Sequence, residues 1–424
     1  MAEDHVGSYY AATLNDKTRY PALDGDTRVD VAIVGGGFSG IATALTFAER
    51  GRSVALVEMN RIGWGASGRN GGQLIAGISG EGEFARQAGV IGRHVLDQIR
   101  YLGHDIIEGR IARYGIDCDL KHGWMEVAAR PSHMKGIRAH VAEMQEKGYG
   151  SHHQIVEPDD LPAIIGTEKY YGGFIDRRSG HLHPLNLCLG EARAAASLGA
   201  RIFEETKAIE ITGGKEPLIR TDRGTIRADA VVLAGDTAHQ FDRGRLNGLH
   251  FPTGTYIIAT EPLSETEVAA INPQDLAICD TNTVLDYYRL SADRRMLFGG
   301  RCNYTNRDPA DIAGTMKARL TEIFPQLSEK RVDYVWSGRI GIVLTRVPAI
   351  GRLEPNLYYM QGYCGHGVNA THIAAEIVAD AIQGTTDRFD VFDKIRQVRL
   401  PIGQWAGNQL LALGMTYYRL RDML

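Results

Sequence analysis

A glycine-rich turn near the start of the chain constrains its fold more than any other feature. Residues 29–34 are a short apolar run rich in β-branched side chains, which is typical of a buried parallel strand. Gly35, Gly37 and Gly40 follow directly, and a helical pattern begins among them. A second apolar strand then ends in Glu58. Together these segments predict a compact βαβ unit.

Each glycine of this G-x-G-x-x-G pattern has its own physical role. Gly35 permits the tight turn, Gly37 lets the backbone approach a pyrophosphate, and Gly40 lets the helix pack close to the sheet. The phosphates then lie at the helix N-terminus, where N–H groups and the dipole favour negative charge. Glu58 is placed to bind both ribose hydroxyls, which disfavours a 2′-phosphate. The alternative is a tight turn with a surface glutamate and no ligand.

A second glycine-rich segment favours one dinucleotide over another. Residues 63–73, GWGASGRNGGQ, follow Glu58 closely, and no Gly-Lys-Ser/Thr ending makes them a Walker A loop. The fingerprint lies within the first 40 residues and this loop follows the acid at once; both features favour FAD over NAD, because FAD needs a second contact region for its flavin half. We expect the loop to run along the cofactor toward the isoalloxazine ring. The predicted contacts are Gly65, Ala66, Ser67, Arg69, Asn70, Gly71, Gly72 and Gln73.

Length and composition exclude several classes of protein. At 424 residues the chain exceeds the usual single core, which predicts two domains. A formal net charge of −4 gives no indication of a nucleic-acid surface. The five cysteines lie far apart without metal-binding spacing, so we expect reduced thiols, no metal site and a cytoplasmic location. There is no signal-peptide pattern and no apolar run of about 18 residues.

Several motifs resemble those of one flavoprotein superfamily. The D-amino-acid oxidase-like, glutathione-reductase-type flavoproteins are similar in VDVAIVGGGFSGIATAL, Glu58 and RIGWGASGRNGGQ. The resemblance extends to WSGRIGIVLTRVPAIGRL and LYYMQGYCGHGVNATHIAAEIVADAI at the far end. Within that superfamily, the γ-glutamylputrescine oxidases resemble this chain in SYYAAT, RIGxGASGRNGGQ, DYYRL…LFGGR and YYRLRD.

The resemblance implies an α/β fold, α+β overall, with two discontinuous domains. One is a glutathione-reductase-type Rossmann FAD-binding domain, and the other is a mainly antiparallel-sheet substrate domain. We expect the FAD-binding domain at residues 29–85, 155–240 and 331–390, and the substrate domain at 86–154 and 241–330. Residues 1–28 form an N-terminal arm, and 391–424 a tail with an amphipathic helix. The pattern at 283–301 predicts a hairpin with its turn near Asp293.

The resemblance also implies the chemistry. An amine C–H hydrogen leaves as hydride to flavin N5, the imine hydrolyses to aldehyde and ammonia, and O2 reoxidises the flavin to give H2O2. γ-Glutamylputrescine or a similar γ-glutamylated polyamine is the implied substrate. One alternative is an amino-acid oxidase or dehydrogenase that passes electrons to a quinone, and the tail helix leaves membrane contact possible but not expected. Another is a flavin-binding sensor without turnover.

The glycine loop at 365–370 lies between a strand and a helix and has two interpretations. Because its helix leads into the tail rather than to a strand ending in an acid, a second dinucleotide site is not expected. The family places its equivalent loop at the flavin N1/O2 edge, where the helix N-terminus stabilises the anionic reduced flavin. The alternative is a turn without a ligand. The remaining predicted cofactor contacts are Phe38, Ser39, Met59, Ala208, Ala234, Gly235, Arg339, Gly365, His366, Gly367, Val368 and Thr371.

Residues 60–80 contain no Cys or His that would bind flavin covalently. Cys302 and Cys364 lie off the expected linkage positions, so we expect non-covalent FAD. His366 has three interpretations: a flavin-side polar group, a substrate contact or a structural hydrogen bonder. It is not assigned as a base, because hydride transfer from a neutral amine needs none.

Tyrosines and arginines supply the candidate substrate contacts. Tyr288 alternates with Tyr287 and Arg289 along a predicted strand, and which tyrosine faces the flavin stays open. Arg339 competes with Arg69 and Arg289 to bind a substrate carboxylate, the alternative being a solvated salt bridge. The candidate catalytic residues are Tyr288, Arg339 and His366, and the candidate substrate contacts are Arg69, Tyr256, Tyr288 and Arg289.

Overall fold

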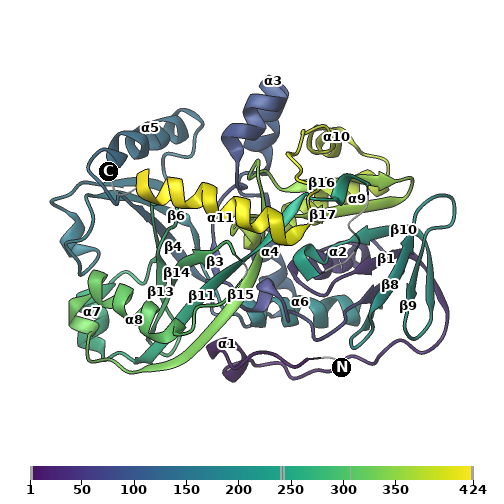
Figure 1. The fold of residues 1–424 in the computed structure, drawn as a ribbon, viewed down its shortest axis with the longest axis horizontal. Helices are drawn as coiled ribbons and strands as arrows, with labels where there is room; N and C mark the ends of the chain where they lie inside the picture. The colour runs from purple at the N-terminus through teal and green to yellow at the C-terminus, as the bar shows by residue number, and fades with distance from the viewer. Residues whose placement is uncertain (1–2, 239–240, 242–243, 306, 422–424) are drawn as a thin grey trace.

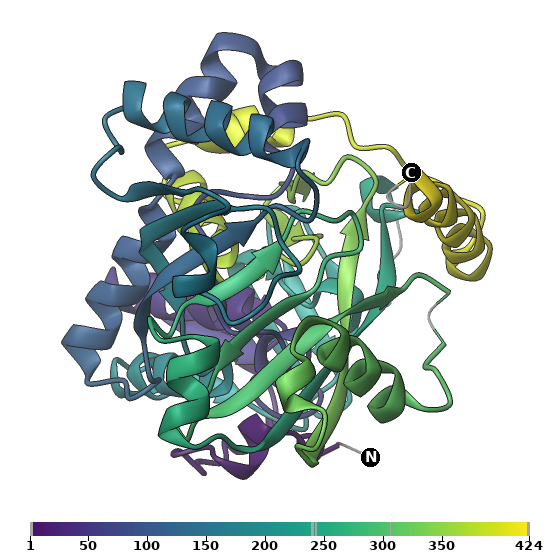
Figure 2. The same cartoon turned by 90° about the vertical axis from the view of Figure 1, so that its left-hand side faces the viewer.

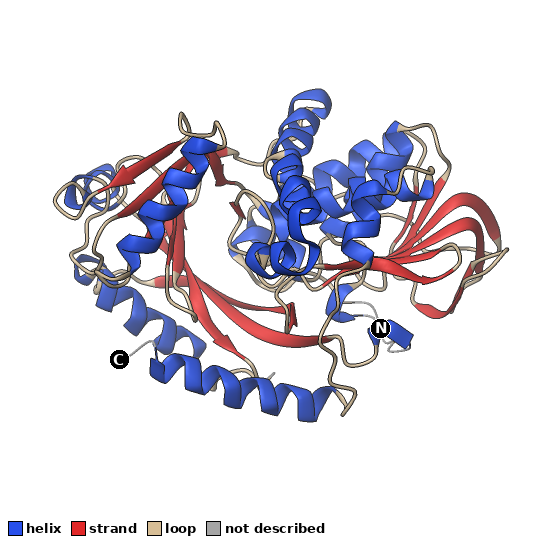
Figure 3. Ribbon diagram, turned by 90° about the horizontal axis from the view of Figure 1, so that it is seen from above, coloured by secondary structure: helices blue, strands red, loops and turns tan. Residues whose placement is uncertain are grey.

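Two β-sheets lie side by side, with helices packed between them (Figures 1 and 3). The structure is a computed structural model that describes residues 3–238, 241, 244–305 and 307–421. The helices are α1 (Tyr9–Ala12), α2 (Phe38–Glu49), α3 (Glu81–Ile99), α4 (Leu102–Tyr114), α5 (His133–Glu146), α6 (Pro184–Ser197), α7 (Glu265–Ile271), α8 (Ile312–Ile323), α9 (Gly367–Ile382), α10 (Asp387–Asp393) and α11 (Gln404–Arg421).

The first sheet has the predicted dinucleotide-binding architecture. Its strands are β1 (Thr27–Val34), β2 (Val54–Val57), β7 (Arg201–Phe203), β8 (Ala208–Thr212), β9 (Leu218–Thr221), β10 (Thr225–Leu233), β16 (Ala349–Glu354) and β17 (Leu357–Gln361). Strands β17, β10, β1, β2 and β7 are parallel neighbours in that order. The predicted βαβ unit is therefore confirmed: β1 leads through the glycine turn into α2 and back into β2. All four residues of β2 are buried, as a strand covered on both faces requires.

The second sheet is mainly antiparallel, as expected. Its strands are β3 (Gln73–Leu74), β4 (Lys121–Val127), β5 (His153–Val156), β6 (Gly173–His181), β11 (His250–Pro262), β12 (Ala277–Asp280), β13 (Tyr287–Leu290), β14 (Arg295–Asn303) and β15 (Val332–Val343). The order is β15-β11-β14-β13-β12-β4-β6-β3, with β5 beside β6, and among the described strands of this sheet only β12 and β4 pair in parallel. The hairpin predicted over 283–301 is formed by β13 and β14, whose turn contains Asp293.

Sheet membership differs from the predicted segments at three places. Strands β3, β6 and β15 pair in the second sheet, although 29–85, 155–240 and 331–390 are segments expected in the FAD-binding domain. Such strands are assigned by the partner they pair with, and those partners lie far away in sequence. A reading of local pattern therefore finds these strands without finding their sheet.

Two hydrophobic cores give the second sheet two distinct faces. The inner face carries Ile257, Leu297 and Trp336, which share one core with α2, α6 and α9. The outer face carries Ile258 and Phe298, which pack with the side chains of α8. The inner face thus looks toward the glycine turn of the first sheet, and any residue that acts on a bound cofactor has to come from it.

Helix α11 lies on the outside of the molecule against the first residues of β11 (Figures 1 and 2). Asn408 Nδ2 donates to the carbonyl oxygens of Pro252 and Tyr304, at 2.8 and 2.7 Å. Trp405 and Leu413 point away from this contact and are each 69% exposed. Within the described residues no helix combines the length and apolar character that a membrane crossing needs.

Candidate flavin and substrate site

The turn between β1 and α2 has the geometry that the glycines predict. Gly35 has a φ of +111°, and a Cβ there would lie 2.7 Å from the Ala234 carbonyl oxygen and 2.9 Å from Gly235 Cα. A Cβ on Gly40 would collide with the Gly35 carbonyl oxygen. Glycine is therefore required for the turn and for the close approach of α2, and the predicted contacts Ala234 and Gly235 border the same turn.

Glu58 closes this turn from the end of β2. Its Oε2 accepts the Gly36 N–H at 2.7 Å and its Oε1 the Asn60 N–H at 2.8 Å. Burial raises the pKa of Glu58, and these two amide bonds oppose that rise. Each carboxylate oxygen keeps a second lone pair for a ribose hydroxyl. Met59, beside it, is 38% exposed, and Ala208 begins β8 two residues after Thr206, whose N–H bonds the Glu58 carbonyl.

The loop 63–73 folds back onto the start of α2. Ser67 Oγ accepts the Phe38 N–H at 2.8 Å, and a Cβ on Gly37 would lie 2.8 Å from the same oxygen. Ala66 and Ser67 belong to a short 3-10 turn. The two glycine segments predicted to touch one cofactor are therefore in direct contact.

Two polar side chains of this loop, Asn70 and Gln73, form hydrogen bonds within the protein. Asn70 Nδ2 donates to the carbonyl oxygens of Ala66 and Ser67, and its Oδ1 accepts the Gly72 N–H at 2.7 Å. Gln73 Nε2 donates to the Ile278 carbonyl oxygen. These amides fix the shape of the loop and its attachment to the second sheet.

Arg69 holds a buried donor without an acceptor. Its Nε donates to the Trp64 carbonyl oxygen at 2.7 Å, and its guanidinium lies 4.2 Å from the centre of the Trp64 ring. Nη2 is buried and has no hydrogen-bond partner within the described part of the chain. Leaving such a donor unpaired costs about 1–3 kcal/mol. A bound group with acceptor oxygens removes that cost, so this residue fits a cofactor or an anionic substrate.

Tyr287, and not Tyr288, faces the loop. A Cβ on Gly71 would lie 2.7 Å from the Tyr287 ring, and a Cβ on Gly299, its cross-strand partner, would overlap that ring. Tyr288 points to the outer face, with its ring 5.1 Å from that of Phe324. The prediction of a catalytic and substrate-binding role for Tyr288 is therefore wrong. Side chains alternate along this strand as expected, but a single strand does not show which of its faces is the inner one.

Arg289 lies on the inner face with Tyr287, and its guanidinium donates hydrogen bonds to groups of the protein itself. Its Nε donates to the Gly71 carbonyl oxygen at 2.7 Å, and its Nη2 to the Leu182 carbonyl oxygen at 2.8 Å and to Tyr10 Oη at 3.1 Å. The side chain is 2% exposed. Its predicted substrate role is corrected: Arg289 anchors the loop.

Arg339 and Tyr256 lie on the outer face. Arg339 is the cross-strand partner of Gly254 and forms an ion pair with Asp308 at 2.8 Å. Tyr256 is 1% exposed and belongs to the outer core. The inner positions of β15 are instead Gly338, which faces Arg69, and Ile340, whose Cδ1 would lie 3.8 Å from a Cβ on Gly365. The prediction that Arg339 and Tyr256 contact the cofactor or the substrate is therefore wrong.

The second glycine loop reaches the same region. Gly365 has a φ of +88° and is exposed, and Gly367 begins α9. His366 Nε2 lies 3.0 Å from the Ala76 carbonyl oxygen; because a carbonyl only accepts, Nε2 carries the proton. Burial lowers the pKa of His366, so the ring is neutral. Of its three interpretations, these contacts favour the structural hydrogen bonder.

The helices that carry the two glycine loops are joined at their N-termini. Ser39 Oγ of α2 donates to Tyr363 Oη, just before α9, at 2.9 Å. The Phe38 ring lies 5.7 Å from that of His372 in the second turn of α9. Val368 and Thr371, two predicted contacts, are buried in the first turns of α9 and are linked by a hydrogen bond from Thr371 Oγ1 to the Val368 carbonyl oxygen.

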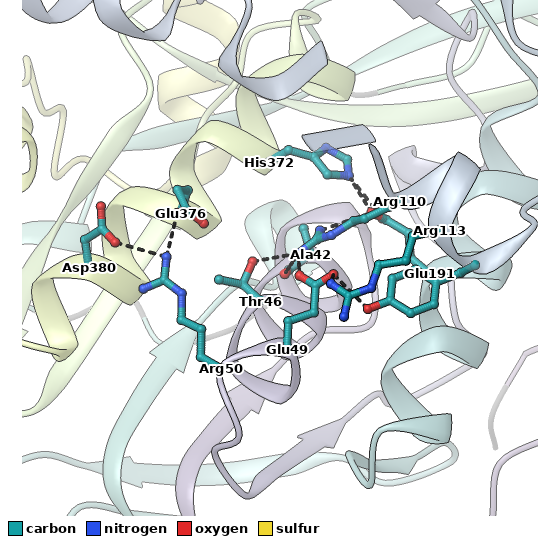
Figure 4. Close-up of polar contacts among 11 residues, drawn as sticks. Ala42, Thr46, Glu49, Arg50, Arg110, Arg113, Glu191, His372, Glu376 and Asp380 are labelled. Carbon is teal, nitrogen blue, oxygen red and sulfur yellow. Dashed lines mark hydrogen bonds and ion pairs between the residues drawn. The ribbon is translucent and has the colours of Figure 1, made fainter. Parts of the chain in front are cut away.

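A buried ionic network joins α4, α6 and α9 to the last turn of α2 (Figure 4). Glu191 of α6 accepts from Arg110 Nη1 at 3.1 Å and pairs with His372 Nε2 at 3.0 Å. Arg110 Nη2 also donates to Thr46 Oγ1 and to Glu49 of α2, at 2.8 and 2.9 Å. Although burial opposes ionisation, His372 and Arg110 hold the pKa of Glu191 below its usual value. Sequence reasoning missed this network, because its members come from four helices with no shared motif.

Comparison with known proteins matches the chain along almost its whole length. The family described as FAD dependent oxidoreductase (DAO) matches residues 30–381. The protein named Gamma-glutamylputrescine oxidoreductase from Escherichia coli is 37% identical over 424 residues, which cover 99% of both chains. One named Probable oxidoreductase OrdL, from Haemophilus influenzae, is 35% identical over 99% of this chain and 98% of its own. The solved structure of glycine oxidase from Geobacillus kaustophilus has a TM-score of 0.69 at 23% identity, covering 84% of this chain and 95% of that one, which shows a shared fold.

Proposed function

Because the chain belongs to the DAO family of FAD-dependent oxidoreductases, we propose that it oxidises the primary amine of a γ-glutamylated polyamine such as γ-glutamylputrescine. The products are an aldehyde and ammonia, and O2 is the electron acceptor. The chain is an FAD-dependent oxidoreductase with FAD as its cofactor. The identity of 37% to a protein named for γ-glutamylputrescine, over 99% of both chains, supports the choice of substrate class.

The residues that would hold FAD fit its two halves. The first turn of α2 and the Glu58 carboxylate suit the pyrophosphate and the ribose. The loop 63–73 and the start of α9 suit the flavin half. The unpaired Nη2 of Arg69 supports this assignment, since FAD and its substrates offer acceptor oxygens. When bound, FAD supplies a two-electron acceptor for the C–H hydrogen of the amine.

One observation favours an amine over an α-amino acid. Three inner-face side chains beside the two glycine loops, Tyr287, Trp336 and Ile340, carry no charge. Arg289 has its donors on the chain itself, and Arg339 pairs with Asp308 on the outer face. The remaining guanidinium, that of Arg69, is assigned above to FAD. An α-amino acid carries a carboxylate on the carbon that is oxidised and would need a guanidinium at that point. A primary amine with its carboxylate far away has no such need.

The same surroundings prepare the amine for reaction. Apolar walls disfavour an ammonium ion and lower its pKa, so they favour the neutral amine that can give up a hydride. The N–H groups at the start of α9 carry partial positive charge and stabilise negative charge nearby. His366 holds its Nε2 proton on the Ala76 carbonyl oxygen and takes no proton from the substrate.

A substrate panel tests this proposal. The purified holoenzyme is assayed with γ-glutamylputrescine, putrescine, glycine, D-alanine and L-proline, both in an oxygen electrode and with a reducible dye. We expect γ-glutamylputrescine to give the highest kcat/KM and to release peroxide. Equal or better turnover of a free amino acid would overturn the substrate, and dye reduction without oxygen uptake would overturn the acceptor.

We also propose that FAD is held without a covalent bond. Burial raises the pKa of both Cys302 and Cys364 to about 11, so neither is a thiolate near neutral pH. Acid precipitation of the holoenzyme should leave its yellow colour in the supernatant. Colour that stays with the protein pellet would contradict this.

A further inference from the structure

A carboxylate with no partner lies on the inner face of the second sheet. Glu126 of β4 is opposite Cys279 of β12, and Cys279 is opposite Tyr287 of β13. Cross-strand partners share a face of a sheet, so Glu126 stands in one row with the tyrosine that contacts the glycine loop. Trp124, two residues earlier on the same face, donates its indole N–H to Gln73 Oε1 of that loop at 3.1 Å. Glu126 is therefore part of the wall that faces the loop.

The surroundings of Glu126 are apolar. Its neighbours along the row are Phe174 and Cys279, which pack with Trp124 and with side chains of α5 in one hydrophobic cluster. No hydrogen bond or charge of a described residue acts on the carboxylate. Burial alone raises the pKa of Glu126 to about 7. A carboxylate in this position is unfavourable unless a cation joins it.

Two fully buried carboxylates, Glu191 and Glu204, are satisfied by cations of the protein. Glu191 pairs with Arg110, and Glu204 pairs with Arg61 at 2.9 Å. Both pairs are made between helices or loops away from the inner face. Glu126 differs from these two because it is partly exposed and no charge or hydrogen bond of a described residue acts on it. A buried acid with a purely structural role would need a partner within the protein, and Glu126 has none among the described residues.

The position of Glu126 matches the length of the proposed substrate. Glu126 and Tyr287 are two strand spacings apart, which is about 10 Å. In γ-glutamylputrescine the α-ammonium group is separated from the reacting carbon by about nine bonds, or roughly 11 Å when extended. A substrate whose reacting end lies beside Tyr287 therefore carries its ammonium group to the neighbourhood of Glu126.

We propose that the Glu126 carboxylate binds the α-ammonium group of a γ-glutamylated amine and thereby selects substrates with a second cation at their far end. This inference rests on the proposed function, because it names a contact for that substrate. It assigns β4 a substrate-binding residue that the sequence shows only as one acid in the apolar stretch WMEVAA.

Two ligands that cannot be oxidised test the contact directly. γ-Glutamyl-n-butylamide lacks the reacting amine, and glutaryl-n-butylamide lacks the α-amino group as well. Their binding to the FAD-loaded enzyme is measured by calorimetry at pH 8. We expect the wild type to bind the γ-glutamyl ligand about 10- to 100-fold more tightly, the value of a charge-assisted hydrogen bond. Glu126→Gln should bind both ligands equally.

Two further variants complete the design. Glu146→Gln removes an exposed acid of α5 and should keep the full preference. Glu126→Asp keeps the charge on a shorter side chain and should keep part of it. Flavin absorbance and a thermal melt of each variant establish that it is folded and loaded. A preference that survives in Glu126→Gln, or that is absent from the wild type, would overturn the assignment.

Activity separates this inference from the proposed function. If γ-glutamylputrescine is not oxidised at all, the proposed function fails. If it is oxidised with the same KM by the wild type and Glu126→Gln, only the role of Glu126 fails. A loss of kcat on every amine, with unchanged preference between the two butylamides, would place Glu126 in the reaction step instead and also overturn the assignment.

Discussion

His372 Nε2 and Glu191 Oε2 lie 3.0 Å apart, and both side chains are fully buried. This pair joins α9, which carries the second glycine loop, to α6. Through Glu191 it continues to Arg110 and so to α2, which carries the first. The two helices that would flank FAD are therefore held by one charged group.

Glu191→Gln should be strongly destabilising. The substitution replaces the carboxylate with an amide, so Arg110 and His372 face a neutral group inside the protein. Breaking a buried ion pair in this way lowers the free energy of unfolding by about 3–5 kcal/mol. We expect the thermal midpoint to fall by about 3–6 °C. The matched control is Glu376→Gln, which removes a half-exposed partner of Arg50 (Figure 4) and should cost about 0–1 kcal/mol. Equal shifts in the two variants would contradict the role of the network.

Arg69→Met should weaken ligand binding more than it weakens the fold. Methionine keeps an aliphatic chain beside Trp64 but removes the buried donor that lacks a partner. We expect the FAD dissociation constant or the substrate KM to rise at least about tenfold, measured by flavin fluorescence titration and by initial rates. The melting point of the apoprotein should change little. Arg19→Met, an exposed control paired with Asp4, should alter neither quantity.

Tyr287→Leu and Tyr288→Leu should have opposite effects. Tyr287 faces Gly71, so its loss should lower kcat/KM about tenfold or more, with a modest effect on stability. Tyr288 lies in the outer core, so its loss should lower stability by about 2–4 kcal/mol and leave kcat/KM of the folded enzyme unchanged. Steady-state kinetics of both variants measure kcat/KM, and thermal melts measure their stability. An unchanged kcat/KM in Tyr287→Leu would show that the inner face was misassigned.

The stability contributed by Glu126 should depend on pH in an unusual direction. Its folded pKa of about 7 lies above its ordinary value of 4.5, so the native state binds the proton more tightly than the unfolded chain. Stability therefore decreases as pH rises from about 4.5 to 7 and is flat above. Relative to the wild type, Glu126→Gln should gain at most about 3 kcal/mol at pH 8 compared with pH 5.

Denaturant titrations of both proteins at the two pH values measure this difference. The other titratable side chains near this part of the sheet are Cys279, Tyr287 and His140, and they are shared by both proteins, so their effects cancel. Asp280, whose pKa burial also raises to about 7, cancels in the same way. A gain of the same size at both pH values would show that Glu126 is not the group that titrates.

Local features of this fold could be predicted from the sequence, because they depend on neighbouring residues. The turn at Gly35, the start of α2 and the position of Glu58 all follow from one short stretch. The hairpin of β13 and β14 was also found from its own pattern. In each case the residues that decide the structure are adjacent in the chain.

The features that escaped prediction depend on distant residues. Tyr288 and Arg339 have the right chemistry, but each points to the outer face, which only the assembled sheet defines. Arg289 has the right face, but its donors are taken by carbonyl groups at Gly71 and Leu182. Glu191 and His372 are 181 positions apart. No local pattern records such a pairing.

The bond between Arg289 and Tyr10 has a consequence for the synthesis of the enzyme. It joins residues 279 positions apart, and Arg289 in turn anchors the loop at Gly71. The start of α9, at Gly367, is later still in the chain. Although the βαβ unit emerges from the ribosome first and can fold early, the surface for the flavin half is incomplete until the last part of the chain has been made. If FAD binds where proposed, its flavin half meets a complete surface only when nearly the whole polypeptide has been made.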